Sequence, residues 1–268
     1  MKFPVLRLYT VAYLIFLYMP IVILPLFAFN NSTAVAFPLR GFTTEWFGAV
    51  FVDAELRGAL VNSLIVAGST AVLATAFGVF AARASTRYNF PGKGPLMGLI
   101  MLPMVLPEMI MAMALLVVLL SLGVKLSLFT VILGHVLVCT PFAVAILTSA
   151  FQSLDKSLEE AAYDLGEGPV STFRLVILPL VLPGIISAML ICFTISIDEF
   201  IVSNFLKSGE DLLSTYIYNK LRFPKYVPNI MALGTILVLV SIALLTLAEF
   251  FRRRGVARAG GKDSGGFL

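Results

Sequence analysis

Residues 151–179 read FQSLDKSLEEAAYDLGEGPVSTFRLVILP, a largely polar segment between two long apolar runs. The apolar runs cover residues 129–150 and residues 180–205. Each is long enough for a helix that crosses the hydrocarbon core of a bilayer, which takes roughly 20 residues. Neither run alternates between apolar and polar residues, as a barrel strand would. The segment is therefore predicted to be a loop between two membrane-spanning helices.

The rest of the chain has the same composition. Apolar residues make up 59% of the 268 residues and charged residues only 13%, whereas soluble domains have about 45–50% and about 25%. We predict six spanning helices, at about residues 8–29, 60–82, 96–120, 129–150, 180–205 and 230–251. The predicted fold class is an all-α polytopic membrane protein. Residues 1–251 would form a single transmembrane domain, and residues 252–268 a basic and then disordered tail.

Basic residues are distributed unevenly between the two sides of these predicted spans. The side with both termini and the 151–179 loop has twelve Lys and Arg residues, and the other side has seven. Because cytoplasmic loops carry the excess of basic residues, both termini and this loop are predicted to be cytoplasmic. The same placement accounts for the net charge of +4. We therefore expect no nucleic-acid partner, and a membrane-lipid environment instead.

Several kinds of active site have no sequence signal here. The chain has no G-x-x-x-x-G-K-[ST] phosphate loop, no G-x-S-x-G and no H-E-x-x-H, the patterns of common nucleotide-binding, hydrolase and zinc sites. Its two cysteines, Cys139 and Cys192, fall inside apolar runs without metal-ligand spacing. We expect a chain that is not an enzyme and binds no cofactor or metal.

The 151–179 loop has the signals of a short helix. Residues 157–160 (SLEE) fit a capping box at its start, and Gly166, Gly168 and Pro169 fit its end. A small apolar face would be formed by Leu158, Ala161, Ala162 and Leu165. A second helical stretch, residues 170–178, would lead into the fifth span. These residues alone leave open whether the helix packs on its own bundle or docks another protein.

The loop also resembles a motif of a known family, the EAA loop of ABC importer permeases. Glu160-Ala161-Ala162 is followed at the family's spacing by Gly166 and then by residues 176–179 (VILP), where Val176 replaces the usual Ile. The resemblance implies a type I ABC importer permease (MetI-like) architecture, in which this helix enters a cleft of an ATPase subunit. It assigns ATPase coupling to Glu160, Ala161, Ala162, Asp164, Gly166, Leu178 and Pro179.

The resemblance extends beyond the loop. Residues 193–205 (FTISIDEFIVSNF) resemble the fifth span of the C-type permease subunit of spermidine/putrescine importers, and residues 41–47 (GFTTEWF) resemble the first external segment of such permeases. This implies import of polyamines across a bacterial inner membrane, with ATPase closure driving alternating access. The implied partners are a second permease subunit of different sequence, a periplasmic solute-binding protein and two ATPase subunits, which would hold ATP and Mg.

Polar residues inside the predicted spans are candidates for a substrate pathway, because such residues are costly in a bilayer and are usually functional. These candidates are Glu108, Asp198, Glu199 and Asn204. Their carboxylates would attract a cation with several amines. Because adjacent helical residues point about 100° apart, at most one of Asp198 and Glu199 is expected to face the route. Alternatively, these side chains hold the bundle together, as we expect for His135.

Three other functions compete with the polyamine importer. The same machinery could carry γ-aminobutyrate, an opine or another amino-acid derivative. The chain could also be an autonomous ion-coupled carrier or channel, but such a protein has no need of the pattern in residues 160–179. An intramembrane enzyme would need a catalytic pair, and the spacing of the polar residues offers none.

Overall fold

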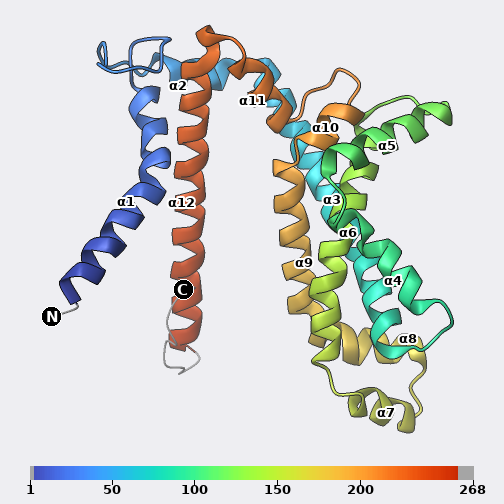
Figure 1. Ribbon diagram of the computed structural model, residues 1–268. Helices are drawn as coiled ribbons and strands as arrows, with labels where there is room; N and C mark the ends of the chain where they lie inside the picture. Colours follow the sequence, from blue (N-terminus) through green and yellow to red (C-terminus); the bar gives the residue numbers. More distant parts are fainter. Residues whose placement is uncertain (1–2, 259–268) are drawn as a thin grey trace. The chain divides into compact units, whose positions relative to one another are not determined.

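The computed structural model describes the backbone of residues 3–258 and the side chains of residues 5–243 and of Thr246. The described chain is helical, and one isolated antiparallel bridge joins Asn30 to Phe42 (Figure 1). The predicted all-α class is thereby confirmed. The helices form two compact units, one from Met1–Asp53 with Ile217–Leu268 and one from Ala54–Tyr216.

The first unit contains α1 (Phe3–Ala28), α2 (Glu45–Val52), η3 (Pro224–Tyr226) and α12 (Val227–Arg258). Helix α12 packs against both α1 and α2. The helix α12 includes the start of the predicted basic tail, and residues 259–268 of that tail lie outside the described residues. Helix α11 (Leu213–Leu221) spans the boundary between the two units.

Two hydrogen bonds hold the start of the short helix α2. The Thr43 hydroxyl oxygen accepts a hydrogen bond from the backbone N–H of Glu45 at 3.2 Å, whereas the side chain of Thr44, the residue before the helix, caps no N–H group. The indole Nε1–H of Trp46 donates to the carbonyl oxygen of Asn30 at 3.0 Å and fixes α2 to the end of α1.

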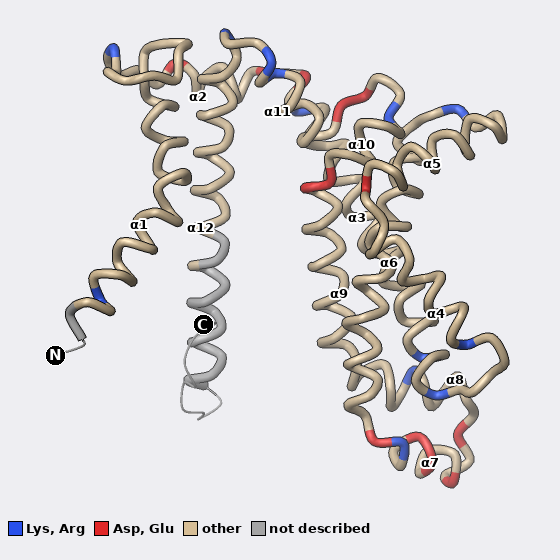
Figure 2. Tube along the Cα trace, in the orientation of Figure 1, with Lys and Arg blue, Asp and Glu red and all other residues tan. Residues whose placement is uncertain are grey.

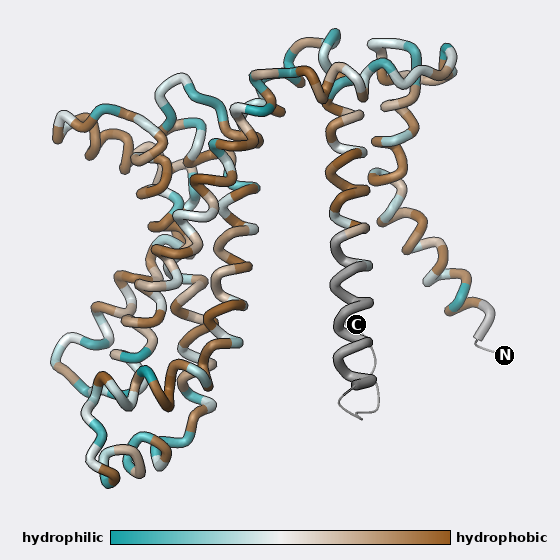
Figure 3. The backbone as a smooth tube through the Cα atoms, turned by 180° about the vertical axis from the view of Figure 1, so that it is seen from behind, coloured by the Kyte–Doolittle hydropathy of each residue, from teal (hydrophilic) through white to brown (hydrophobic). Residues whose placement is uncertain are grey.

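The core of the second unit is a bundle of α3 (Ala54–Arg87), α6 (Leu128–Gln152) and α9 (Leu178–Asp198). Helix α3 packs against both of the others, and its interface with α6 is the more extensive. Small residues permit the close approach: a Cβ atom built on Gly78 of α3 would lie 2.8 Å from the Cβ of Ala143 on α6. Hydrophobic residues dominate these long helices, and hydrophilic residues gather in the loops at their ends (Figure 3).

The third predicted span is not one continuous helix. Residues 96–120 fall on α4 (Lys93–Met101), η1 (Leu102–Met104) and α5 (Glu108–Ser121), and the axis bends by 107° between the two parts. Pro103 and Pro107 explain the break, because proline lacks the N–H of the helical ladder and disfavours helical geometry in the residue before it. Within the described residues, five helices are long and apolar enough to span a membrane, or six if the bent pair counts as one.

The fifth predicted span begins earlier and ends earlier than residues 180–205. Helical structure starts at α8 (Pro169–Thr172), passes through a π-helical turn, η2 (Phe173–Ile177), and continues as α9 to Asp198. The chain then breaks at Glu199 and Phe200 before the short α10 (Ile201–Leu206). The break gives the two adjacent acids, Asp198 and Glu199, different surroundings.

Candidate functional site

Helix α7 (Ser157–Asp164) forms the centre of the 151–179 loop, and it starts differently from the predicted capping box. Ser157 is already inside the helix, and no side-chain cap joins it to Glu160. Instead, the Oδ1 atom of Asp155 accepts the backbone N–H of Ser157 at 3.0 Å. Hydrogen bonds from the Ser157 backbone and hydroxyl lower the pKa of the Asp155 carboxyl. The predicted box was wrong because Lys156 already has helical geometry, which moves the start of the helix toward Asp155.

The end of α7 has the geometry that the two glycines predicted. The N–H of Glu167 donates to the carbonyl oxygen of Ala162 at 3.1 Å, and the N–H of Gly166 donates to that of Tyr163 at 2.9 Å. This pair of bonds is a Schellman motif, which requires a left-handed residue after the helix. Gly166 supplies it with φ of +88°, a conformation that a side chain at this position would strain.

Most of α7 is accessible rather than packed on its own bundle. Ala162 is the one residue of this fully described helix that is buried. Of the predicted apolar face, Ala161 is exposed, and Leu158 and Leu165 are 43% and 87% exposed. Glu160 and Asp164 are exposed as well. The geometry therefore favours a docking surface over a helix that covers its own protein.

A second set of the predicted coupling residues lies where the loop joins α9. Leu178 and Pro179 open α9 directly after the π-helical turn, and proline fits there because the first turn of a helix needs no N–H donor. An open hollow of about 570 Å³ is lined by Gly168, Pro169, Val170, Ser171, Arg174 and Leu175. Helices α7 and α8 lie together at the end of the second unit where α9 begins (Figure 1).

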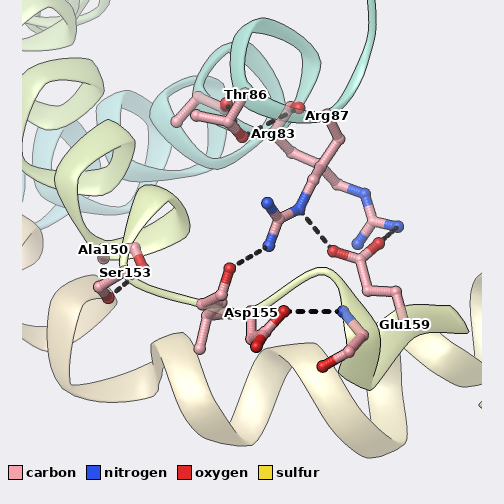
Figure 4. Close-up of polar contacts among 10 residues, drawn as sticks. Arg83, Thr86, Arg87, Ala150, Ser153, Asp155 and Glu159 are labelled. Atoms are coloured by element: carbon pink, nitrogen blue, oxygen red, sulfur yellow. Dashed lines mark hydrogen bonds and ion pairs between the residues drawn. The ribbon is translucent and has the colours of Figure 1, made fainter. Parts of the chain in front are cut away.

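Three charged residues that the motif did not indicate connect this loop to α3. The Nε–H of Arg87 donates to Oε1 of Glu159 at 2.6 Å, and Arg83 lies 3.9 Å from the other carboxylate oxygen (Figure 4). Arg87 also donates from Nη2 to the carbonyl oxygen of Leu154 at 3.1 Å. From sequence, Glu159 fits the capping box, and the two arginines contribute only to the predicted topology. Because Arg87 and Glu159 are 72 positions apart in the sequence, local spacing carries no signal for this contact.

The opposite end of the second unit carries the predicted pathway residues. Figure 2 shows that charged residues of this unit gather at its two ends, with uncharged helices between them. Asp198 is exposed at the last turn of α9. Glu199 is only 7% exposed, and its Oε1 accepts the backbone N–H of Val202 at 3.0 Å, which caps α10. Of the two adjacent acids, Asp198 is the one that is accessible.

Glu108 and Asn204 complete the predicted set. Glu108 is the first residue of α5 and is exposed, in a position where the helix dipole favours a negative charge. It lies within electrostatic reach of Glu199. Asn204 is exposed on α10. The structure therefore brings residues from α5, α9 and α10 to one end of the unit, although it buries Glu199.

His135 joins three parts of this end through two hydrogen bonds. Its Nδ1 lies 2.7 Å from the hydroxyl oxygen of Ser196 on α9, and its Nε2 lies 2.9 Å from that of Ser203 on α10. The Ser203 hydroxyl already donates to the carbonyl oxygen of Glu199 at 2.7 Å. Ser203 must therefore accept from Nε2–H, which leaves Nδ1 as acceptor for the Ser196 hydroxyl. The predicted interhelical hydrogen bond of His135 is confirmed.

Comparison with known proteins gives one family match and several relatives. The family described as "Binding-protein-dependent transport system inner membrane component" matches residues 74–258. The spermidine/putrescine transport system permease protein PotC of Haemophilus influenzae is 33% identical, over 89% of this chain and 93% of the relative. The putrescine transport system permease protein PotI of Escherichia coli K12 is 31% identical, over 91% of this chain and 92% of the relative.

Solved structures agree with this fold. A bacterial alginate ABC transporter, solved with an alginate pentasaccharide-bound periplasmic protein, matches with a TM-score of 0.72 at 20% identity, over 94% of this chain and 93% of that chain. The MetNI methionine ABC transporter in an inward-facing conformation matches with a TM-score of 0.55 at 18% identity, over 75% of this chain and 94% of that chain. At these identities the likeness concerns the fold alone.

Proposed function

The chain belongs to the family of binding-protein-dependent transport system inner membrane components, and from this premise we propose that its cargo is a polyamine. The chain is a permease subunit of an ABC importer and is not itself an enzyme. The observation that carries the mechanism is the exposed helix α7, closed at Gly166 and followed by Leu178 and Pro179 at the spacing of the coupling motif.

The coupling step is proposed to run through α7. Glu160, Ala161 and Asp164 are exposed on this helix and would contact the cleft of an ATPase subunit. The left-handed Gly166 lets the chain turn back directly after the helix, so that α7 stands out from the bundle. Leu178 and Pro179 open the long helix α9. Closure of the ATPase would displace α7 and thereby shift the base of α9.

The partners follow from the family. The full importer would contain a second permease subunit of different sequence, a periplasmic solute-binding protein and two ATPase subunits. ATP and Mg would bind to those ATPase subunits, and this chain would bind no cofactor. The chain would lie in the bacterial inner membrane with both termini in the cytoplasm, on the side that carries the excess of Lys and Arg.

The polyamine cargo is supported by the carboxylates at the end of the unit opposite α7. Asp198 and Glu108 are exposed there, and Asn204 adds a neutral polar group. Exposed carboxylates attract a cation with several amines most strongly where water is partly excluded. Glu199 would contribute its charge without touching the cargo, because its side chain is buried and caps α10. PotC and PotI, the relatives of this chain, carry spermidine or putrescine in their names.

A transport assay on the assembled importer tests this proposal. Vesicles that contain the complex receive ATP, the binding protein and one labelled solute: spermidine, putrescine or γ-aminobutyrate. We expect ATP-dependent uptake of a polyamine that unlabelled spermidine inhibits. Uptake of γ-aminobutyrate and of neither polyamine would contradict the proposed cargo. Uptake driven by an ion gradient without ATP would contradict the assignment to an ATP-driven importer.

A further inference from the structure

We propose that Arg83 and Arg87 of α3 and Glu159 of α7, here called the α3–α7 ion cluster, hold the coupling helix against the bundle and transmit its movement to α3. These are positioning residues, since they act through α7 and need not touch the cargo or ATP. The inference rests on the proposed function, because the cluster has this task only if α7 docks on a moving ATPase.

The contacts in the cluster engage both oxygens of the Glu159 carboxylate. Oε1 accepts the 2.6 Å hydrogen bond from Arg87 Nε, and Oε2 forms the 3.9 Å ion pair with Arg83 Nη2. The side chains of Arg87, Arg83 and Glu159 are 9%, 14% and 13% exposed. Charge-assisted hydrogen bonds are stronger than neutral ones, and partial burial reduces their screening by water and salt. The cluster is thus a stronger link than a surface ion pair.

The rest of α7 offers few alternative attachments. Ala162 is the one buried residue of α7, and the helix packs mainly against α8 and η2, the segments that follow it in the chain. The Arg87 side chain also holds the segment before α7, through the carbonyl oxygen of Leu154. A direct tie from α7 to a long spanning helix therefore comes from the ion cluster. Because α3 packs against both α6 and α9, a force on α3 reaches the whole bundle.

Arg83 extends the link to the start of α9. Its guanidinium carbon lies 4.6 Å from the centre of the Phe173 ring, a distance typical of cation–π contacts. Phe173 begins the π-helical turn that precedes α9. The Nη1 atom of Arg83 is buried and has no hydrogen-bond partner among the described side chains, so the position of this side chain depends on Glu159 and on the ring. Arg83 therefore contacts the two segments on either side of the Gly166–Gly168 turn.

The two adjacent acids of α7 have separate surroundings as a result. Glu159 is held by the arginines, whereas Glu160 is exposed. Neighbouring residues on a helix point about 100° apart, so one acid can face α3 while the next faces a partner. We infer that Glu160 serves docking and Glu159 serves transmission, and that the two functions can be separated by mutation.

The test compares Glu159→Gln, which removes the charge and keeps the size, with Glu167→Gln as the matched control. Glu167 is an exposed acid of the same loop, and it forms no ion pair among the described side chains. Assembled complexes are assayed for retained ATPase subunit, ATP hydrolysis and cargo transported per ATP. We expect Glu159→Gln to retain the ATPase and to transport about tenfold less cargo per ATP, the factor that one charge-assisted hydrogen bond contributes to an equilibrium. The control should match wild type.

A conservative variant shows whether the effect comes from this contact. Arg87→Lys, which keeps a positive charge toward Glu159, should retain part of the coupling that Arg87→Gln loses. Wild-type coupling in Glu159→Gln would overturn the inference, and so would equal coupling in Arg87→Lys and Arg87→Gln. Failure of the proposed function can be distinguished from failure of this inference. If the proposed function is wrong, the wild-type chain itself retains no ATPase subunit.

Discussion

Each end of the helical unit formed by residues 54–216 carries two adjacent acids, one held by neighbouring groups and one exposed. At the α7 end, Glu159 is paired with arginines and Glu160 is exposed. At the other end, Glu199 caps α10 and Asp198 is exposed. Two ion pairs neutralise Glu159, whereas Glu199 has no ion pair among the described side chains. At both ends one acid is held in place by its contacts, and the exposed acid is available to a partner or to cargo.

The largest expected effect comes from the turn that ends α7. Gly166→Ile places a β-branched side chain at φ of +88°, which costs about 1–2 kcal/mol in strain and opens the Schellman motif. We expect the α7 surface to be lost and uptake to fall by more than about tenfold. Gly168→Ala is the matched control, because Gly168 has φ of −81° and space for a Cβ atom. Equal uptake by the two variants would contradict the role of the turn.

The next largest effect separates the two acids at the opposite end. Asp198→Asn should lower polyamine uptake by about tenfold at limiting cargo, because the exposed carboxylate is removed, with assembly unchanged. Glu199→Gln should lower the thermal stability instead, since the buried carboxylate caps α10. Initial rates over a range of cargo concentrations, with melting curves of the same preparations, give both values. The proposal fails if Asp198→Asn, alone and combined with Glu199→Gln, transports as wild type does.

A moderate effect is expected from the histidine that supports this end. His135→Ala removes two buried hydrogen bonds and leaves the hydroxyls of Ser196 and Ser203 without their partner. We expect a loss of about 1–3 kcal/mol in the free energy of unfolding, measured by thermal denaturation in detergent. Thr140→Val on the same helix is the control, because Thr140 bonds only within its own turn, to Val136. A similar melting temperature for both variants would argue against a special role of His135.

The smallest effect concerns the cap of α7. Asp155→Ala should increase amide hydrogen exchange in the first turn of the helix, whereas Asp155→Asn should not, because asparagine also caps. The pKa of Asp155 is lowered by its hydrogen bonds to Ser157. Its stabilisation is therefore complete above the ordinary Asp pKa of about 3.9 and is lost as the pH falls through the lower folded value. If the amide exchange rates of Asp155→Ala equal those of wild type, Asp155 does not cap α7.

The sequence predicted best those features that depend on nearby residues. The end of α7 at Gly166 follows from the chemistry of one glycine, and the apolar runs follow from composition. The cap at Asp155 was missed because Asp155 and Ser157 lie two residues apart, and the side-chain oxygen of either could cap the start of a helix. Pro103 and Pro107 indicated a broken helix in the third span, but the sequence could not give the 107° angle of the break. Both points concern where helices begin and stop, and not whether they exist.

Contacts between distant segments could not be predicted. Arg87 and Glu159 are 72 residues apart. In the sequence, neither differs from any other charged residue beside a membrane span. The same holds for His135 and its two serines, which lie on three helices. The positions of Asp198 and Glu199 were half predicted: helical geometry implied that only one is accessible, but the break after Asp198 decides which one.

The most direct test of the central claim is recovery of the chain from its native membrane in mild detergent, followed by mass spectrometry of the proteins that accompany it. The account predicts a second permease subunit and an ATPase with the wild-type chain, and loss of the ATPase with Glu160→Lys while the second permease remains. Recovery of the wild-type chain alone, or full retention of the ATPase by Glu160→Lys, would contradict the account.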